Sequence, residues 1–174
     1  LGLAALDRPN EWWFDSKTKT VYYMPPAKAD PNSMELRGRV RDFGIELDRC
    51  SGIEIRGLGF HASGFWLKEC NDVSLRDCTF DYPATHRFLH GQFQYVAAWN
   101  PSSNGNTMPS FFGGKRNSFV NNTVRWCNAP VYLGSEEMVI ENCLFSDIEW
   151  DVNSNGGSGA VMIGKDSIFR RNTI

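Results

Sequence analysis

The chain has 174 residues, a formal net charge of −2 and a pI near 5.9. This length fits one domain, and the slightly acidic balance argues against nucleic acid or an anionic membrane surface as a partner. No apolar run approaches the ~20 residues that cross a bilayer, so we expect no membrane span.

Residues 1–33 are predicted to form a separate N-terminal region, and residues 34–174 the main one. Within the first region, the aromatic runs at 11–15 and 21–24 indicate the two strands of a β-hairpin. The Ala, Asp, Pro and Ser residues of 27–33 indicate a linker.

A repeat of 20 residues dominates the middle of the chain. When Gly44–Phe60 is aligned with Gly64–Phe80, apolar residues coincide: Ile45/Phe65, Leu47/Leu67, Cys50/Cys70, Ile53/Val73, Ile55/Leu75 and Phe60/Phe80. Apolar and polar residues alternate in each short run, which is the periodicity of a strand. A unit of about 20 residues with three short strands is typical of one coil of a parallel β-helix.

The same columns return later, with insertions between them. The repeating groups are Phe119/Asn122/Val124, Met138/Ile140/Cys143/Phe145 and Phe169/Asn172/Ile174. The first strand of each coil is expected at Ile45/Leu47, Phe65/Leu67, Phe93/Tyr95, Val131/Leu133 and Val161/Ile163. The sequence therefore predicts an all-β fold, a parallel β-helix of about five coils with three parallel sheets. The alternative, an antiparallel sandwich, gives its hairpins no reason to keep a column-by-column repeat.

The chain starts without Met, shows no signal peptide and stops within a coil pattern. We therefore expect a piece of a longer protein, with further coils beyond residue 174. The five cysteines are not spaced like a zinc site, so no metal site is predicted. Cys50 and Cys70 should stack about 4.8 Å apart, which is within disulfide range. Buried free thiols are the other interpretation.

Four short segments of the chain resemble segments of a known group of proteins. Glu11–Asp15, Val21–Pro25, Ile140-Glu-Asn-Cys-Leu-Phe145 and Phe169-Arg-Arg-Asn-Thr-Ile174 resemble bacterial right-handed parallel β-helix proteins that act on polysaccharides. The chain is most similar to glycoside hydrolase family 141 and its relatives. Polysaccharide lyases and alginate epimerases share this pectin lyase-like coil. The resemblance implies a secreted or periplasmic protein with a polysaccharide or oligosaccharide substrate. No catalytic motif of one family matches, so no catalytic residue is carried over.

Chemistry in a β-helix must lie on an outward face or in loops, because apolar side chains fill the interior. All three histidines, together with paired carboxylates and tryptophans, follow the third strands of successive coils, along one predicted edge. The candidate catalytic residues there are Asp81, Asp147 and His61. The candidate substrate-binding residues are Arg125, His86, His90, Glu149, Trp126 and Trp150. The Gly-, Asn- and Pro-rich residues 98–116 are expected to form a long irregular loop from another corner.

Asp81 and Asp147 lie two coils apart in this scheme, so their backbones should be roughly 9–10 Å apart. This spacing favours a glycoside hydrolase of the inverting type, in which two carboxyls stand ~6.5–9.5 Å apart. No cofactor is required for that chemistry. A polysaccharide lyase or epimerase would instead need a base such as His, Lys or Arg, and Ca²⁺ or Arg to neutralise a uronate. The third alternative is a non-catalytic β-helix, an adhesin or a carbohydrate-binding module. Its loops would usually be short and uniform, unlike those of this chain.

Overall fold

A computed structural model of the protein describes residues 2–39, 41, 43–84, 109–148 and 161–174. Contacts within the chain group it into two compact units, Leu1–Gly38 and Arg39–Ile174. Most described residues of the second unit lie in strands or in the short turns between them. The helix found among the described residues is two short 3-10 segments, η1 (Leu3–Ala5) and η2 (Pro31–Ser33), in the first unit.

The first unit contains the predicted hairpin. Strands β1 (Trp12–Asp15) and β2 (Thr20–Tyr23) pair antiparallel, with Trp12 opposite Tyr23. The rings of Trp13 and Tyr22 stack across the strands with centroids 5.5 Å apart. Cross-strand aromatic pairs of this kind stabilise an isolated hairpin.

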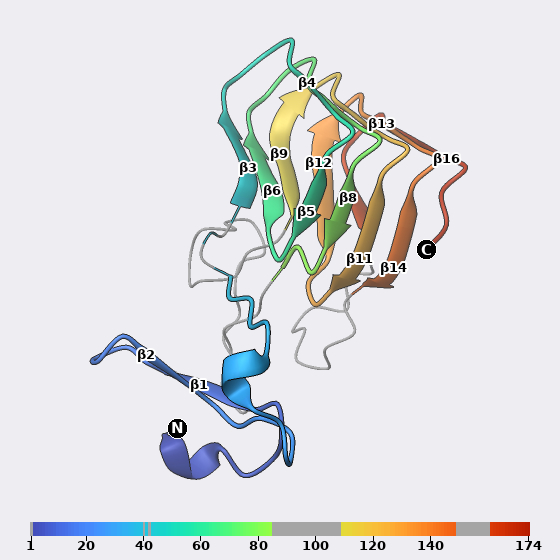
Figure 1. Cartoon of the computed structure of the whole chain (residues 1–174). Coiled ribbons are helices and arrows are strands. Elements are labelled where there is room, and N and C mark those ends of the chain that lie inside the picture. The colour runs from blue at the N-terminus through green and yellow to red at the C-terminus, as the bar shows by residue number, and fades with distance from the viewer. Residues whose placement is uncertain (1, 40, 42, 85–108, 149–160) are drawn as a thin grey trace. The chain divides into compact units, whose positions relative to one another are not determined.

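Parallel sheets make up the second unit (Figure 1). The first sheet contains, in spatial order, β3 (Phe43–Asp48), β6 (Gly64–Lys68), β9 (Ser110–Lys115), β12 (Val131–Glu136) and β15 (Val161–Ile163). The second contains β4 (Glu54–Arg56), β7 (Ser74–Arg76), β10 (Ser118–Val120), β13 (Val139–Glu141) and β16 (Ile168–Arg170). The third contains β5 (Gly59–His61), β8 (Thr79–Asp81), β11 (Thr123–Cys127) and β14 (Leu144–Ile148). The chain visits the three sheets in turn, which is a parallel β-helix-like arrangement.

The predicted columns are confirmed as register pairs. Ile55 is opposite Leu75, and Phe60 is opposite Phe80, both in parallel pairs. The later columns follow the same register, with Phe80 opposite Val124 and Val124 opposite Phe145. The antiparallel sandwich is therefore excluded for these strands.

One predicted strand is wrong. The strand between β6 and β12 is β9, in which Phe111 is opposite both Leu67 and Leu133. Phe93 and Tyr95, which were expected there, lie outside the described residues. The end of the expected loop at 98–116 is this strand, because Ser110-Phe-Phe continues the apolar column despite the glycines that follow.

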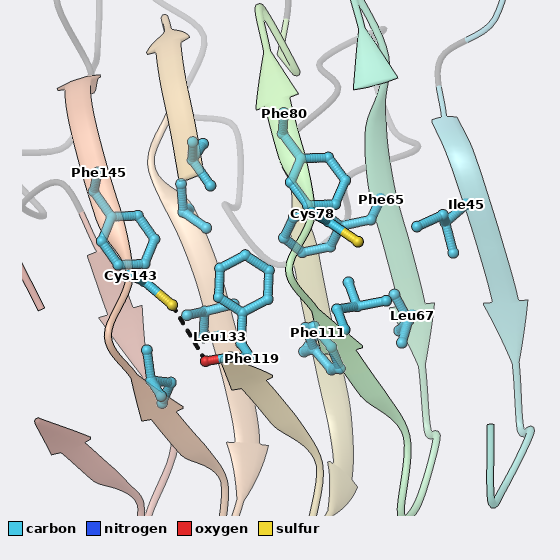
Figure 2. Packing of buried hydrophobic residues seen from close by; sticks show 14 of the residues in the cluster. Ile45, Phe65, Leu67, Cys78, Phe80, Phe111, Phe119, Leu133, Cys143 and Phe145 are labelled. Carbon is cyan, nitrogen blue, oxygen red and sulfur yellow. Dashed lines mark hydrogen bonds between the residues drawn. The ribbon is translucent and has the colours of Figure 1, made fainter. Parts of the chain in front are cut away.

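Phenylalanine rings fill the interior between the sheets (Figure 2). Phe119 is completely buried, and its ring centroid lies 5.4 Å from that of Phe65 and 6.1 Å from that of Phe145. Phe80 and Phe111 complete this buried group, with Phe80 4.9 Å from Phe65. Burial of these rings is the main favourable contribution to folding, since each removes a large apolar surface from water.

A two-residue turn follows each described strand of the second sheet, and the first four of these turns lead into β5, β8, β11 and β14. Its first residue has a left-handed backbone, as in Asp77, Asn121 and Asn142 with φ of 54°, 57° and 55°. Its second residue points inward, and we name Cys78, Asn122, Cys143 and Asn172 the inner turn column. Asn122 Oδ1 accepts from the Cys78 backbone N–H, and Asn122 Nδ2 donates to the Leu75 carbonyl, both at 2.8 Å. The Cys143 thiol donates to the Phe119 carbonyl (Figure 2).

Candidate functional site

The candidate site lies where the strands of the third sheet end. His61, Asp81, Arg125 and Ser146 are register partners across β5, β8, β11 and β14. The residues just before them point inward, since Phe80, Val124 and Phe145 are buried. Strand alternation therefore turns Asp81, Arg125 and Ser146 towards the outside.

The next residue in each coil bends the chain away from the sheet. Ala62, Tyr82, Trp126 and Asp147 all have a left-handed backbone, with φ between 52° and 54°. Asp147 thus lies on the same edge as Asp81 and Arg125 but one residue further along, level with Trp126. Ser146 occupies the position that continues the Asp81 column.

Asp81 and Arg125 form a two-pronged ion pair across neighbouring strands. Arg125 Nε lies 2.9 Å from Asp81 Oδ1, and Arg125 Nη2 lies 3.0 Å from Asp81 Oδ2. The side chains are only partly exposed, 21% for Asp81 and 37% for Arg125. Hydrogen bonding to Asp81 raises the pKa of Arg125 above its ordinary value, so the guanidinium stays charged. The pair holds a fixed negative and a fixed positive group side by side.

Exposed aromatic rings lie beside this ion pair. The rings of Tyr82 and Trp126 stack with centroids 4.9 Å apart and an interplanar angle of 20°. The Arg125 guanidinium lies 4.7 Å from the Trp126 ring centroid, a cation–π contact. His61 meets Tyr82 edge-on at 5.5 Å. We name His61, Tyr82 and Trp126, with Asp81 and Arg125, the aromatic platform.

The platform remains open to solvent. Tyr82 is 44% exposed and Trp126 is 37% exposed, although large apolar rings are normally buried. Tyr82 was not predicted as a site residue. The sequence contained the signal, because Tyr82 follows Asp81 just as Trp126 follows Arg125, and the two columns are in register.

Asp147 is held differently from Asp81. Its Oδ2 accepts a hydrogen bond from the neighbouring Ser146 hydroxyl. In the described part of the chain it forms no ion pair with Arg125, whose guanidinium binds Asp81 instead. The two carboxylates therefore have separate surroundings, one beside a cation and one beside a hydroxyl.

Other predicted site residues lie outside the described residues, namely His86, His90, Glu149 and Trp150. Within the described ranges, no group of three or more His, Cys, Asp or Glu side chains is arranged to hold a metal ion. The same ranges contain no helix with the length and apolar character that a membrane crossing requires.

Comparisons with known proteins add no further assignment. No protein-family model, no curated protein and no solved structure matches the chain.

Proposed function

We propose that the chain is a carbohydrate-active protein whose aromatic platform binds a polysaccharide, and that it acts as a glycoside hydrolase. In this proposal the coils form a right-handed parallel β-helix of about five turns, similar to glycoside hydrolase family 141 and its relatives. The protein would act outside the cytoplasm, where such polymers are met.

The observation that supports sugar binding is the exposed Tyr82–Trp126 stack beside a charged pair. The apolar face of a pyranose packs against an aromatic ring, while its hydroxyl groups need polar partners at the rim. Asp81 offers acceptors and Arg125 offers donors at that rim. An aromatic surface with fixed donors and acceptors on one side matches a sugar better than it matches a purely apolar ligand.

The two carboxylates suit different roles in hydrolysis. In this proposal Asp81, held beside Arg125, is the general base that activates water. Asp147 lies level with Trp126, and a sugar stacked there would cover it and exclude water. In this proposal Asp147 is the general acid that donates a proton to the leaving group. The separation of β8 and β14 by one strand gives about 10 Å between the two backbones, which suits an inverting enzyme.

Binding is tested with Trp126→Ala, measured by affinity electrophoresis against a panel of polysaccharides. We expect the variant to lose at least ~10-fold in affinity for the glycan that wild type binds, because it removes one ring of the stack. The matched control is Trp12→Ala, which removes an exposed tryptophan from the hairpin and should leave binding unchanged. Equal affinity of wild type and Trp126→Ala would reject the platform as the sugar site.

Hydrolysis is tested on the glycan so identified. Asp147→Asn and Asp81→Asn should each lower kcat by roughly 10²-fold or more, as loss of a general acid or base does. A product with the ultraviolet absorbance of an unsaturated uronate would replace hydrolysis by a lyase reaction. Tight binding with no product of either kind would leave a non-catalytic carbohydrate-binding protein.

A further inference from the structure

Two cysteines lie opposite each other on adjacent coils, at the turn between the first and second sheets. Asp48 is opposite Lys68 in the strand pair before them, and Ser51 bridges to Asn71 just after them. The Asn71 N–H donates to the Cys50 carbonyl at 3.0 Å, which fixes the register at the cysteines themselves. Neighbouring strands lie about 4.8 Å apart, within the ~4.4–6.8 Å that separates the Cα atoms of a disulfide.

The two side chains also point the same way. The Cys50 thiol donates to the Asp48 carbonyl, and the Cys70 thiol to the Lys68 carbonyl, both at 3.4 Å. Because Asp48 and Lys68 are register partners, these equal contacts stack one sulfur above the other. Cys70 Sγ also lies 3.7 Å from the Leu47 carbonyl, so it reaches into the coil that carries Cys50.

We infer that Cys50 and Cys70 are an oxidisable dithiol that closes to a disulfide between these two coils. Each is a free thiol in the structure. On the other side of Cys70 the next coil presents Gly114, where any Cβ would overlap the Cys70 carbonyl. In the inner turn column, by contrast, Asn122 separates Cys78 from Cys143. Cys50 is therefore the described cysteine stacked directly on Cys70.

Accessibility gives the two thiols different parts in the reaction. Cys50 is half-buried, whereas Cys70 is 1% exposed and burial raises its pKa. Cys50 therefore meets the oxidant first. Its thiolate attacks one sulfur of a small disulfide such as oxidised glutathione, the S–S bond breaks, and one glutathione leaves as a thiol. The Cys70 thiolate then attacks Cys50 Sγ and releases the second. The two cysteine protons end on the two glutathione thiols.

The test uses the folded wild-type chain, reduced and then incubated with oxidised glutathione. Of its five cysteines, two should be lost to thiol titration in denaturant. Non-reducing peptide mapping should show a single linked pair, Cys50 with Cys70. Cys127→Ser, at a buried cysteine outside the pair, is the matched control and should keep this link.

Cys50→Ser should abolish the link, and Cys50→Ala repeats the test with a smaller side chain that makes no hydrogen bond. The inference is overturned if folded wild type keeps five titratable thiols. It is equally overturned if Cys50 stops at a mixed disulfide with glutathione, or if the Cys50–Cys70 link forms only after unfolding in urea.

Discussion

At the scale of single residues, the inner turn column shows how side chains close a narrow turn by bonding to the backbone. The side-chain amide of Asn122 accepts from the Cys78 N–H and donates to the Leu75 carbonyl. Both of these backbone groups belong to the same neighbouring coil. Asn172 repeats this between Cys143 and Ile140, with bonds of 2.8 and 3.0 Å. Cys143, between the two asparagines, and Cys78, before the first of them, are small enough to fit, and their thiols donate weakly to backbone carbonyls. Each asparagine therefore bridges the N–H of a turn residue and the carbonyl of the strand residue three positions before it.

We expect Asn122→Ala to destabilise the chain by about 1–3 kcal/mol, because it leaves the buried Cys78 N–H unpaired and removes a hydrogen bond to the Leu75 carbonyl. The change in unfolding free energy is measured by urea titration. Asn121→Gly is the matched control, since Asn121 is exposed and its left-handed backbone suits glycine. The control should cost less than ~1 kcal/mol. Equal losses in the two variants would contradict the bridging role.

Part of the candidate site could be predicted residue by residue. Asp81, Arg125 and His61 follow apolar column residues, so the repeat itself places them on one edge. The same columns pair Phe80 with Phe145, and therefore Asp81 with Ser146 rather than Asp147. Asp147 was predicted as a site residue from its acidic side chain, and Tyr82 was not predicted. The ion pair between Asp81 and Arg125 was not predictable, because the rotamers of both side chains decide whether they meet across the strands.

At the scale of elements, column position decides how much a side chain contributes. Phe119, Ile140 and Phe169 are successive register partners in β10, β13 and β16. Phe119 is completely buried, whereas Phe169 in the last strand of the sheet is 36% exposed. A phenylalanine in this column is therefore packed on all sides in β10 but only on some sides in β16.

Phe119→Ala should destabilise the chain by about 3–5 kcal/mol, through lost burial and the cavity left among the other rings. Phe169→Ala, its partner in the column, should cost less than half as much because water already reaches that ring. Both values come from urea unfolding with wild type measured alongside. If the two variants lose the same free energy, burial does not set the contribution of the column.

The element that could not be predicted was β9. The 20-residue offset holds between β3 and β6 but is lost in the long segment between β8 and β9. Several aromatic residues in that segment offer alternative matches to a strand, and Phe93/Tyr95 is one of these matches. Once the 20-residue spacing is interrupted, the local pattern of apolar residues cannot decide which segment pairs with Leu67. The resulting pair, Leu67 with Phe111, depends on packing from both neighbouring strands.

At the scale of the whole molecule, charged groups on different turns contribute to stability in the same direction. The pKa is lowered below its ordinary value in Asp72, Asp77 and Glu141, chiefly by side-chain hydrogen bonds from Arg116, Asn121 and Arg170 respectively. The unfolded chain therefore binds more protons than the folded chain in mildly acidic solution. Stability from these groups is present above their ordinary pKa values and is lost as the pH falls through the lower folded values.

We expect the Tm to be nearly constant above about pH 5 and to fall steadily towards pH 3, given ordinary pKa values of 3.8 for Asp and 4.5 for Glu. The triple variant Asp72→Asn, Asp77→Asn, Glu141→Gln removes the three linked groups and should show a shallower fall. Thermal unfolding followed by circular dichroism at a series of pH values measures both curves. Parallel curves for variant and wild type would show that other groups control the acid response.

The turns between the second and third sheets keep the same two-residue length, whereas the segments after the third strands differ, at 62–63, 82–109, 128–130 and 149–160. The number of coils and the residues in the segments after the third strands can therefore change independently. If a second copy of residues 57–76 were inserted directly after Arg76, its apolar residues would lie in the same register columns as those of the coils on either side. The chain could then grow by one intact layer while Asp81, Arg125 and Asp147 keep their own spacing.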